Sequence, residues 1–140
     1  MYIRTMLLNL RPLPRSFLIL WGLGAAMNSL SLLLLTAEIG DASAWGYASG
    51  WQRDVGMGDL VWAILVFTAA RKAEHASQRF LCGSLTLFSA ALAAHHASAY
   101  VQAGHLPYHR FWLAMNGFAV VWGAFCLRNS RSIKTERSSP

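Results

Sequence analysis

Five polar side chains able to do chemistry lie within otherwise apolar stretches of this sequence: Asp59, His95, His96, Tyr100 and Asn116. Ionisable groups are costly in lipid, so those that persist there usually face the interior of a helix bundle and mark a binding site or a proton path. His96 and Tyr100 are four residues apart and share a helix face. His95 is rotated from that face by about 100°. We therefore predict that these five residues form a polar ligand site inside the bundle, with a structural hydrogen-bond network that holds the helices together as the alternative.

Two kinds of chemistry fit such a set of residues. Hydrogen bonding from an imidazole, a phenol or an amide would hold the polar head of a small hydrophobic molecule, such as a quinone or a lipid. A carboxylate and a histidine in a dry pocket could also perform acid–base chemistry on a lipid-soluble substrate. The sequence leaves both readings open.

Metal and haem chemistry receive less support from the spacing of the histidines. The adjacent His95 and His96 diverge on a helix and match no local metal-binding motif. Haem held between helices would need two histidines at one depth, or one histidine with an open position. His109 is expected about 7 Å shallower than His96, counting about 1.5 Å per helical residue, which disfavours such a pair. Cys82 and Cys126 form no CxxC motif, and we expect them to be small buried side chains.

Four apolar runs must position these residues: 16–37, 55–70, 80–103 and 111–127. A spanning helix needs about 20 apolar residues, so the second run is expected to begin earlier, near Gly50. The chain is 55% hydrophobic and 13% charged, whereas soluble domains carry about 25% charged residues. The sequence therefore predicts an all-α membrane protein, a bundle of four transmembrane helices with lipid as its solvent.

The basic residues predict the orientation of this bundle. With both termini in the cytoplasm, ten of the twelve Lys and Arg residues are cytoplasmic and only Arg53 and Arg110 lie outside, as the positive-inside rule requires. The net charge of +6 is spread between the apolar runs, which argues against a nucleic-acid partner. Residues 1–128 form one predicted transmembrane domain, and the polar segment 129–140 is expected to be a disordered cytoplasmic tail. Cleavage after the A-x-A string at Ala42–Ala44 remains an alternative that would leave three helices.

Residues 50–70 (GWQRDVGMGDLVWAILVFTAA) carry an Arg-Asp pair followed by glycines and an apolar run. This segment resembles the second-helix region of small four-helix bacterial membrane proteins of the DoxX-like and related uncharacterised groups. The resemblance implies a four-helix fold in a bacterial inner membrane and implies no established activity. Members of those groups carry an acidic residue in the third helix, where this chain has His95 and His96.

Three functional hypotheses follow from the sequence. The first is an accessory or non-catalytic membrane protein whose outward-facing polar pocket binds a small hydrophobic molecule, a quinone or a lipid. The second is a membrane oxidoreductase or isomerase that uses His96, Tyr100 and Asp59. The third is a structural subunit that binds a membrane-protein partner through its Gly, Ala and Ser faces. The sequence leaves the cofactor, the metal content and the question of catalysis undecided.

Overall fold

The computed structural model of the protein describes residues 14–104 and 106–136, which form five helices. They are α2 (Pro14–Leu34), α3 (Thr36–Ala42), α4 (Ser49–Lys72), α5 (His75–Gln102) and α6 (Pro107–Glu136). The four long helices are rich in Leu and Ala and contain no proline after their first residue, so nothing interrupts their backbone hydrogen bonds. α2 and α6 each begin with a proline, whose missing N–H would be unpaired at that position in any case.

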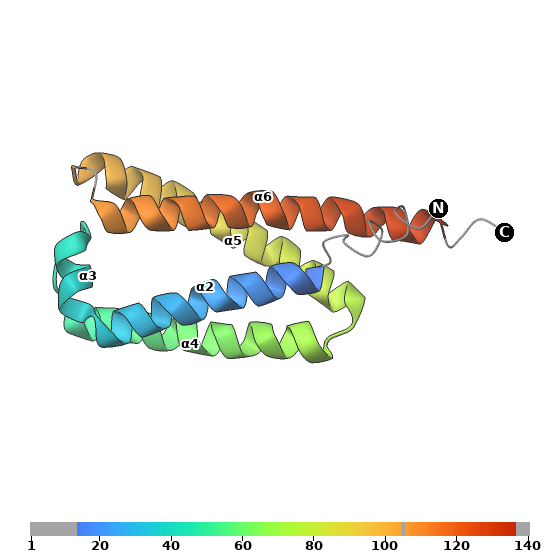
Figure 1. The fold of residues 1–140 in the computed structure, drawn as a ribbon, viewed down its shortest axis with the longest axis horizontal. Coiled ribbons are helices and arrows are strands. Elements are labelled where there is room, and N and C mark those ends of the chain that lie inside the picture. The colour runs from blue at the N-terminus through green and yellow to red at the C-terminus, as the bar shows by residue number, and fades with distance from the viewer. Residues whose placement is uncertain (1–13, 105, 137–140) are drawn as a thin grey trace, which may run out of the picture.

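The long helices form two antiparallel pairs, α2 with α4 and α5 with α6 (Figure 1). α2 also packs against α5 and α6 and so joins the two pairs. α5 crosses the bundle diagonally, and the pairs diverge toward the end that carries α3 (Figure 1). We call this the α3 end, and we call the opposite end, where residues 73–74 connect two helices, the α4–α5 end.

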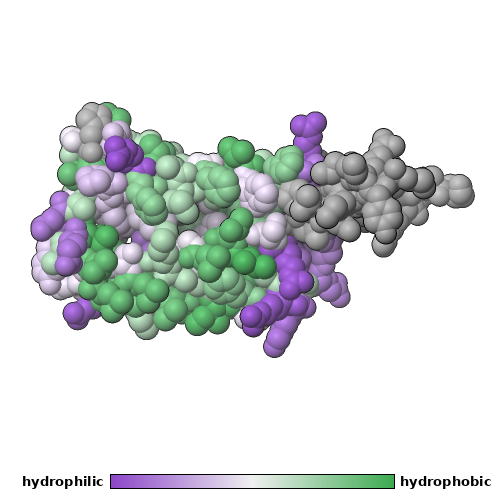
Figure 2. Space-filling model, in the orientation of Figure 1, coloured by the Kyte–Doolittle hydropathy of each residue, from purple (hydrophilic) through white to green (hydrophobic). Residues whose placement is uncertain are grey.

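Among the described residues, three helices are long and apolar enough to cross a membrane: α2, α5 and the Pro107–Ser130 part of α6. α4 is not among them, because Gln52, Arg53, Asp54 and Asp59 make its first half polar. Figure 2 shows an apolar surface along the middle of the molecule, with hydrophilic groups gathered toward its ends. These features indicate a small multi-pass membrane protein whose surface contacts the lipid bilayer.

The helix bounds differ from the predicted runs in two places. The first run is split, because the chain leaves helical geometry at Leu35 and α3 turns across the end of the bundle. α6 continues to Glu136, because residues 129–136 contain neither Gly nor Pro to stop the helix, and the disordered tail expected for 129–140 stays a prediction. Residues 1–13 of the predicted domain and 137–140 of the predicted tail lie outside the described residues. The predicted start near Gly50 is confirmed, since α4 begins at Ser49.

The dry core of the bundle lies near the α4–α5 end. Buried side chains from all four long helices meet there: Phe17, Leu18, Val66, Ala70, Cys82, Leu85 and Cys126. The prediction that both cysteines are small buried groups is confirmed, because neither has any exposed surface. Helices approach closely where glycine occurs. A Cβ on Gly123 would lie 2.9 Å from Phe17 Cε2 and would collide with Thr86, and a Cβ on Gly22 would lie 3.1 Å from the Phe67 ring.

Candidate functional site

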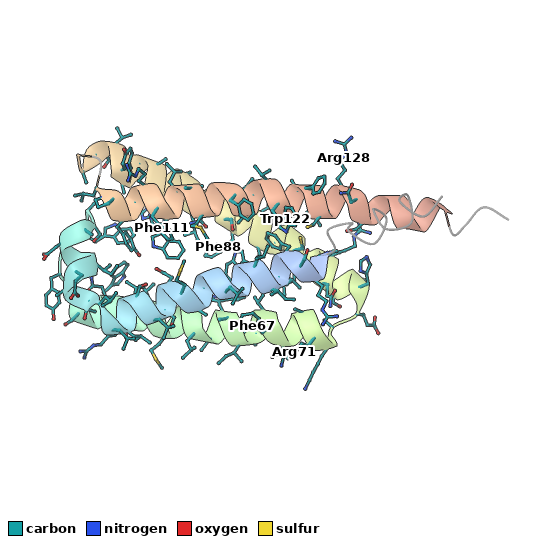
Figure 3. The ribbon with its side chains drawn as sticks, in the orientation of Figure 1. Phe67, Arg71, Phe88, Phe111, Trp122 and Arg128 are labelled. Carbon is teal, nitrogen blue, oxygen red and sulfur yellow. The ribbon has the colours of Figure 1, made fainter. Side chains whose placement is uncertain are left out.

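A cavity of about 320 Å³ lies between the two helix pairs. All four long helices and the connection between α3 and α4 contribute to its lining, which is mainly apolar and aromatic. Phe88 and Trp122, two of the lining residues, lie between the helix pairs in Figure 3. The lining includes five of the six tryptophans of the chain, namely Trp21, Trp45, Trp51, Trp112 and Trp122. A concave apolar site with few polar groups is the usual form of a small-molecule pocket.

One wall of the cavity carries a hydrogen-bonded network that joins three helices. The Tyr108 hydroxyl on α6 donates to Asn28 Oδ1 on α2 at 3.3 Å. The Asn28 amide nitrogen in turn donates to Asp59 Oδ2 on α4 at 2.6 Å. This network links the two helix pairs across the cavity, and it supplies Asp59 with a donor where lipid would supply none.

A second polar contact joins α5 to α6. His96 Nδ1 lies 3.1 Å from His109 Nδ1, and the two rings are 7% and 0% exposed. His109 Nε2 also accepts a hydrogen bond of 2.8 Å from the backbone N–H of Ala44. The two rings meet, which the residue count along the helices did not lead us to expect. Counting residues along two axes ignores the diagonal course of α5 (Figure 1) and the reach of the two rings.

Trp45 lines the cavity near its α3 end. It lies on the connection between α3 and α4, next to Gly46, whose φ of 65° favours glycine. Its ring stacks on His95, with ring centroids 5.5 Å apart and planes 13° from parallel. It also meets the ring of His109 edge to face at 4.8 Å and that of Trp51 at 5.2 Å. The backbone hydrogen bond from Ala44 to His109 therefore attaches the connection that carries Trp45 to α6, within a cluster of aromatic rings.

The structure brings most of the sequence-predicted site residues to this one cavity. Asp59, His95, His96 and Asn116 all line it. The Asn116 amide donates to the Trp112 carbonyl of its own helix at 2.9 Å. Tyr100 is partly buried on α5 and is not among the described residues of the lining. The trio of His96, Tyr100 and Asp59 is therefore not assembled around the cavity.

Sequence reasoning missed four residues that build the site: Asn28, Trp45, Tyr108 and His109. Asn28 carried a usable signal, because it is the one amide in the first apolar run. Tyr108 and His109 follow Pro107, which begins α6 and so places both in its first turn, at the level where Trp45 covers the bundle. No short-range pattern points to these contacts, because each joins separate elements.

The described residues include no group of three or more His, Cys, Asp or Glu side chains placed to hold a metal ion. The polar side chains near the cavity instead form hydrogen bonds with one another, as in the network from Tyr108 to Asp59. Hydrogen bonding of an uncharged molecule is the chemistry that this arrangement offers.

Comparison with protein-family models, with curated proteins and with solved structures finds no match for this chain. The resemblance to DoxX-like proteins is therefore not supported. The fold and its apolar surface define a class, that of small all-helical multi-pass membrane proteins.

Proposed function

We propose that this chain is a four-span membrane protein that holds a small hydrophobic molecule, a quinone or a lipid, in the cavity between its helix pairs. The observation that carries the proposal is the cavity itself, about 320 Å³ in volume and lined mainly by apolar and aromatic side chains. That volume lies at the lower end of the roughly 300–1,000 Å³ found for ligand pockets. It suits a compact head group with part of an aliphatic chain.

The proposal takes α4 as the fourth span. Its 24 residues extend over about 36 Å at 1.5 Å per residue, enough for a hydrocarbon core of about 30 Å. α4 runs antiparallel to α2 along its length (Figure 1). Asp59, the most deeply placed acidic residue of α4, is hydrogen-bonded to Asn28, which lowers the cost of carrying it into the membrane.

The proposal also places both termini in the cytoplasm of a bacterial cell, with the α3 end facing outward. Basic residues gather at the α4–α5 end: Arg15, Arg71, Lys72, Arg79 and Arg128. Arg71 and Arg128 project outward there from two different helices (Figure 3). The α3 end holds Arg53 and Arg110 together with the acidic Glu38, Asp41 and Asp54. This asymmetry fits the positive-inside rule for an inner-membrane protein.

Purification in mild detergent tests the proposal. The protein would be extracted with organic solvent, and mass spectrometry would compare the extract with that of an unrelated membrane protein purified in the same way. We expect one class of lipid-soluble molecule to be enriched at close to one per chain. Extracts that match in composition and amount would contradict a resident ligand.

Two glycines offer a matched pair of variants for this experiment. A Cβ on Gly24, which lines the cavity, would have no heavy atom within 4 Å. The Cβ of Gly24→Leu would therefore lie in open space at the cavity, and the rest of the leucine side chain would take up cavity volume. A Cβ on Gly58, which is exposed on α4, is equally unobstructed. We expect Gly24→Leu to lose the enriched molecule and Gly58→Leu to retain it, and equal retention by both would overturn the assignment of the ligand to this cavity.

A further inference from the structure

The hydrogen bonds around His96 and His109 determine where the ring protons lie. The Ala44 backbone N–H can only donate, so His109 Nε2, 2.8 Å away, must carry no proton. The proton of the neutral His109 ring is then on Nδ1. That atom lies 3.1 Å from His96 Nδ1. A hydrogen bond between two ring nitrogens needs one protonated and one unprotonated nitrogen, so His96 Nδ1 is the acceptor. The proton of His96 is therefore on Nε2.

This assignment gives the cavity a fixed hydrogen-bond donor. His96 lines the cavity, whereas His109 is not among the described lining residues. Nδ1 of His96 is engaged with His109, so Nε2–H is the polar atom of His96 that remains for a ligand. An imidazole normally exchanges between two tautomers and can either donate or accept. Here the chain from Ala44 through His109 removes that choice, and His96 can only donate.

Four other donors of the lining have protein partners, whereas the buried Trp122 indole N–H, also part of the lining, has none among the described residues. The Tyr108 hydroxyl and the Asn28 amide donate within the network that ends at Asp59. The Asn116 amide donates to a carbonyl of its own helix, and the Trp21 indole donates to Ser89 Oγ at 3.1 Å. A donor in an apolar cavity gains most from an acceptor that brings no unpaired proton of its own.

We infer that the cavity selects an uncharged carbonyl group, which accepts a hydrogen bond from His96 Nε2. The inference rests on the proposed function and deepens it by naming the chemical group that is recognised. A quinone oxygen and the ester oxygen of a lipid share this chemistry. His96 binds the ligand directly, and His109 is a positioning residue that keeps the Nε2 tautomer in place.

Three ligands of similar shape that differ at one polar group test the inference. They are para-octylacetophenone, which only accepts, para-octylphenol, which also donates, and octylbenzene, which does neither. Each would be added to the detergent-purified protein, and binding would be measured as the rise in melting temperature, which follows the affinity for the folded state. We expect the ketone to bind about tenfold more tightly than octylbenzene, as one net hydrogen bond implies, and more tightly than the phenol.

The outcomes separate the inference from the proposed function. If none of the three raises the melting temperature, the cavity takes no such molecule and the proposed function fails as well. If all three bind equally, or if the phenol binds best, the cavity stands and the carbonyl inference is overturned. If the ketone binds best, the same assay with a short-chain benzoquinone and a monoacylglycerol identifies the source of the carbonyl. The one that binds more tightly shares the head group of the natural ligand.

Two substitutions at His96 isolate its donor. An asparagine side chain places its amide near the Nδ1 position, so His96→Asn retains a partner for His109 and loses the group that reaches the cavity. A glutamine places its amide near the Nε2 position and retains that donor. We expect the ketone preference to disappear in His96→Asn and to persist in part in His96→Gln. The reverse result would overturn the role of Nε2.

Two substitutions at His109 test the positioning role. His109→Asn retains an N–H that can donate to His96 Nδ1, whereas His109→Leu does not. Nitrogen NMR shifts of the His96 ring should report the Nε2–H tautomer in the native protein and in His109→Asn, and a mixture of tautomers in His109→Leu. The ketone preference should follow the same order. An unchanged tautomer and an unchanged preference in His109→Leu would show that His109 acts only through packing.

Discussion

A single methyl group added at Gly123 should destabilise the bundle, whereas the same group added at Gly117 should not. Both glycines lie on α6, about two turns apart. A Cβ at position 123 would lie 2.9 Å from Phe17 Cε2 and 3.1 Å from Thr86 Cβ, with a still closer approach to the Thr86 hydroxyl. A Cβ at position 117 would have no heavy atom within 4 Å. The two substitutions therefore differ in their surroundings and not in their chemistry.

The expected size of the effect follows from which neighbours would have to move. Thr86 is a β-branched residue whose hydroxyl bonds to the Cys82 carbonyl at 2.7 Å, so its side chain cannot rotate away without losing that bond. Phe17 is 1% exposed and packs in the buried core. Overpacking of this kind costs about 1–3 kcal/mol. Alanine stabilises a helix by up to about 1 kcal/mol relative to glycine. Gly117→Ala should therefore be as stable as the native protein or slightly more stable.

Reversible unfolding of the detergent-solubilised protein by increasing sodium dodecyl sulfate would measure both variants. We expect Gly123→Ala to be less stable than Gly117→Ala by about 1–3 kcal/mol, close to one or two powers of ten in the unfolding equilibrium. Thr86→Ala should rescue Gly123→Ala in part, because it removes the Thr86 hydroxyl, the atom nearest to the new methyl group, and leaves the contact with Phe17. Equal stability of the two alanine variants, or no rescue, would refute the close packing of α5 on α6 at this position.

Three further predictions concern topology, the polar network and the cavity. With both native cysteines buried, a membrane-impermeant thiol reagent applied to intact cells should label Ala48→Cys and spare Ser77→Cys, and the opposite pattern would invert the proposed orientation. Asn28→Leu removes the donor to Asp59 and should cost about 1–2 kcal/mol in the same unfolding assay; a neutral result would mean that the network contributes nothing to stability. A quinone that enters the cavity should quench most tryptophan emission, and Trp62→Phe, which removes the tryptophan outside the described lining, should increase the quenched fraction; a decrease would place the quencher elsewhere.

The sequence was sufficient to predict the long helices and the kind of environment in which they lie. Apolar runs without internal proline form helices for local reasons, because each backbone N–H finds its acceptor four residues earlier. The low share of charged residues and the positions of the basic residues can likewise be read from the sequence alone. α4 was the hardest of the four to recognise, since polar residues such as Arg53 and Asp59 dilute its apolar character. The sequence also indicated Asp59, His95, His96 and Asn116 as a group, since a polar side chain in an apolar run is conspicuous without any knowledge of its partners.

Only the tertiary structure decided which of these polar atoms meet. The contacts of Tyr108 with Asn28 and of Asn28 with Asp59 join residues 80 and 31 positions apart, and His96 meets His109 across a turn between two helices. Depth counted at a fixed rise per residue treats helices as parallel rods, whereas α5 crosses the bundle diagonally (Figure 1). The tilt results from how the side chains of all four helices pack, above all where a glycine such as Gly123 lets backbones approach. That packing is a property of the whole chain, and it sets the direction in which His96 presents its proton.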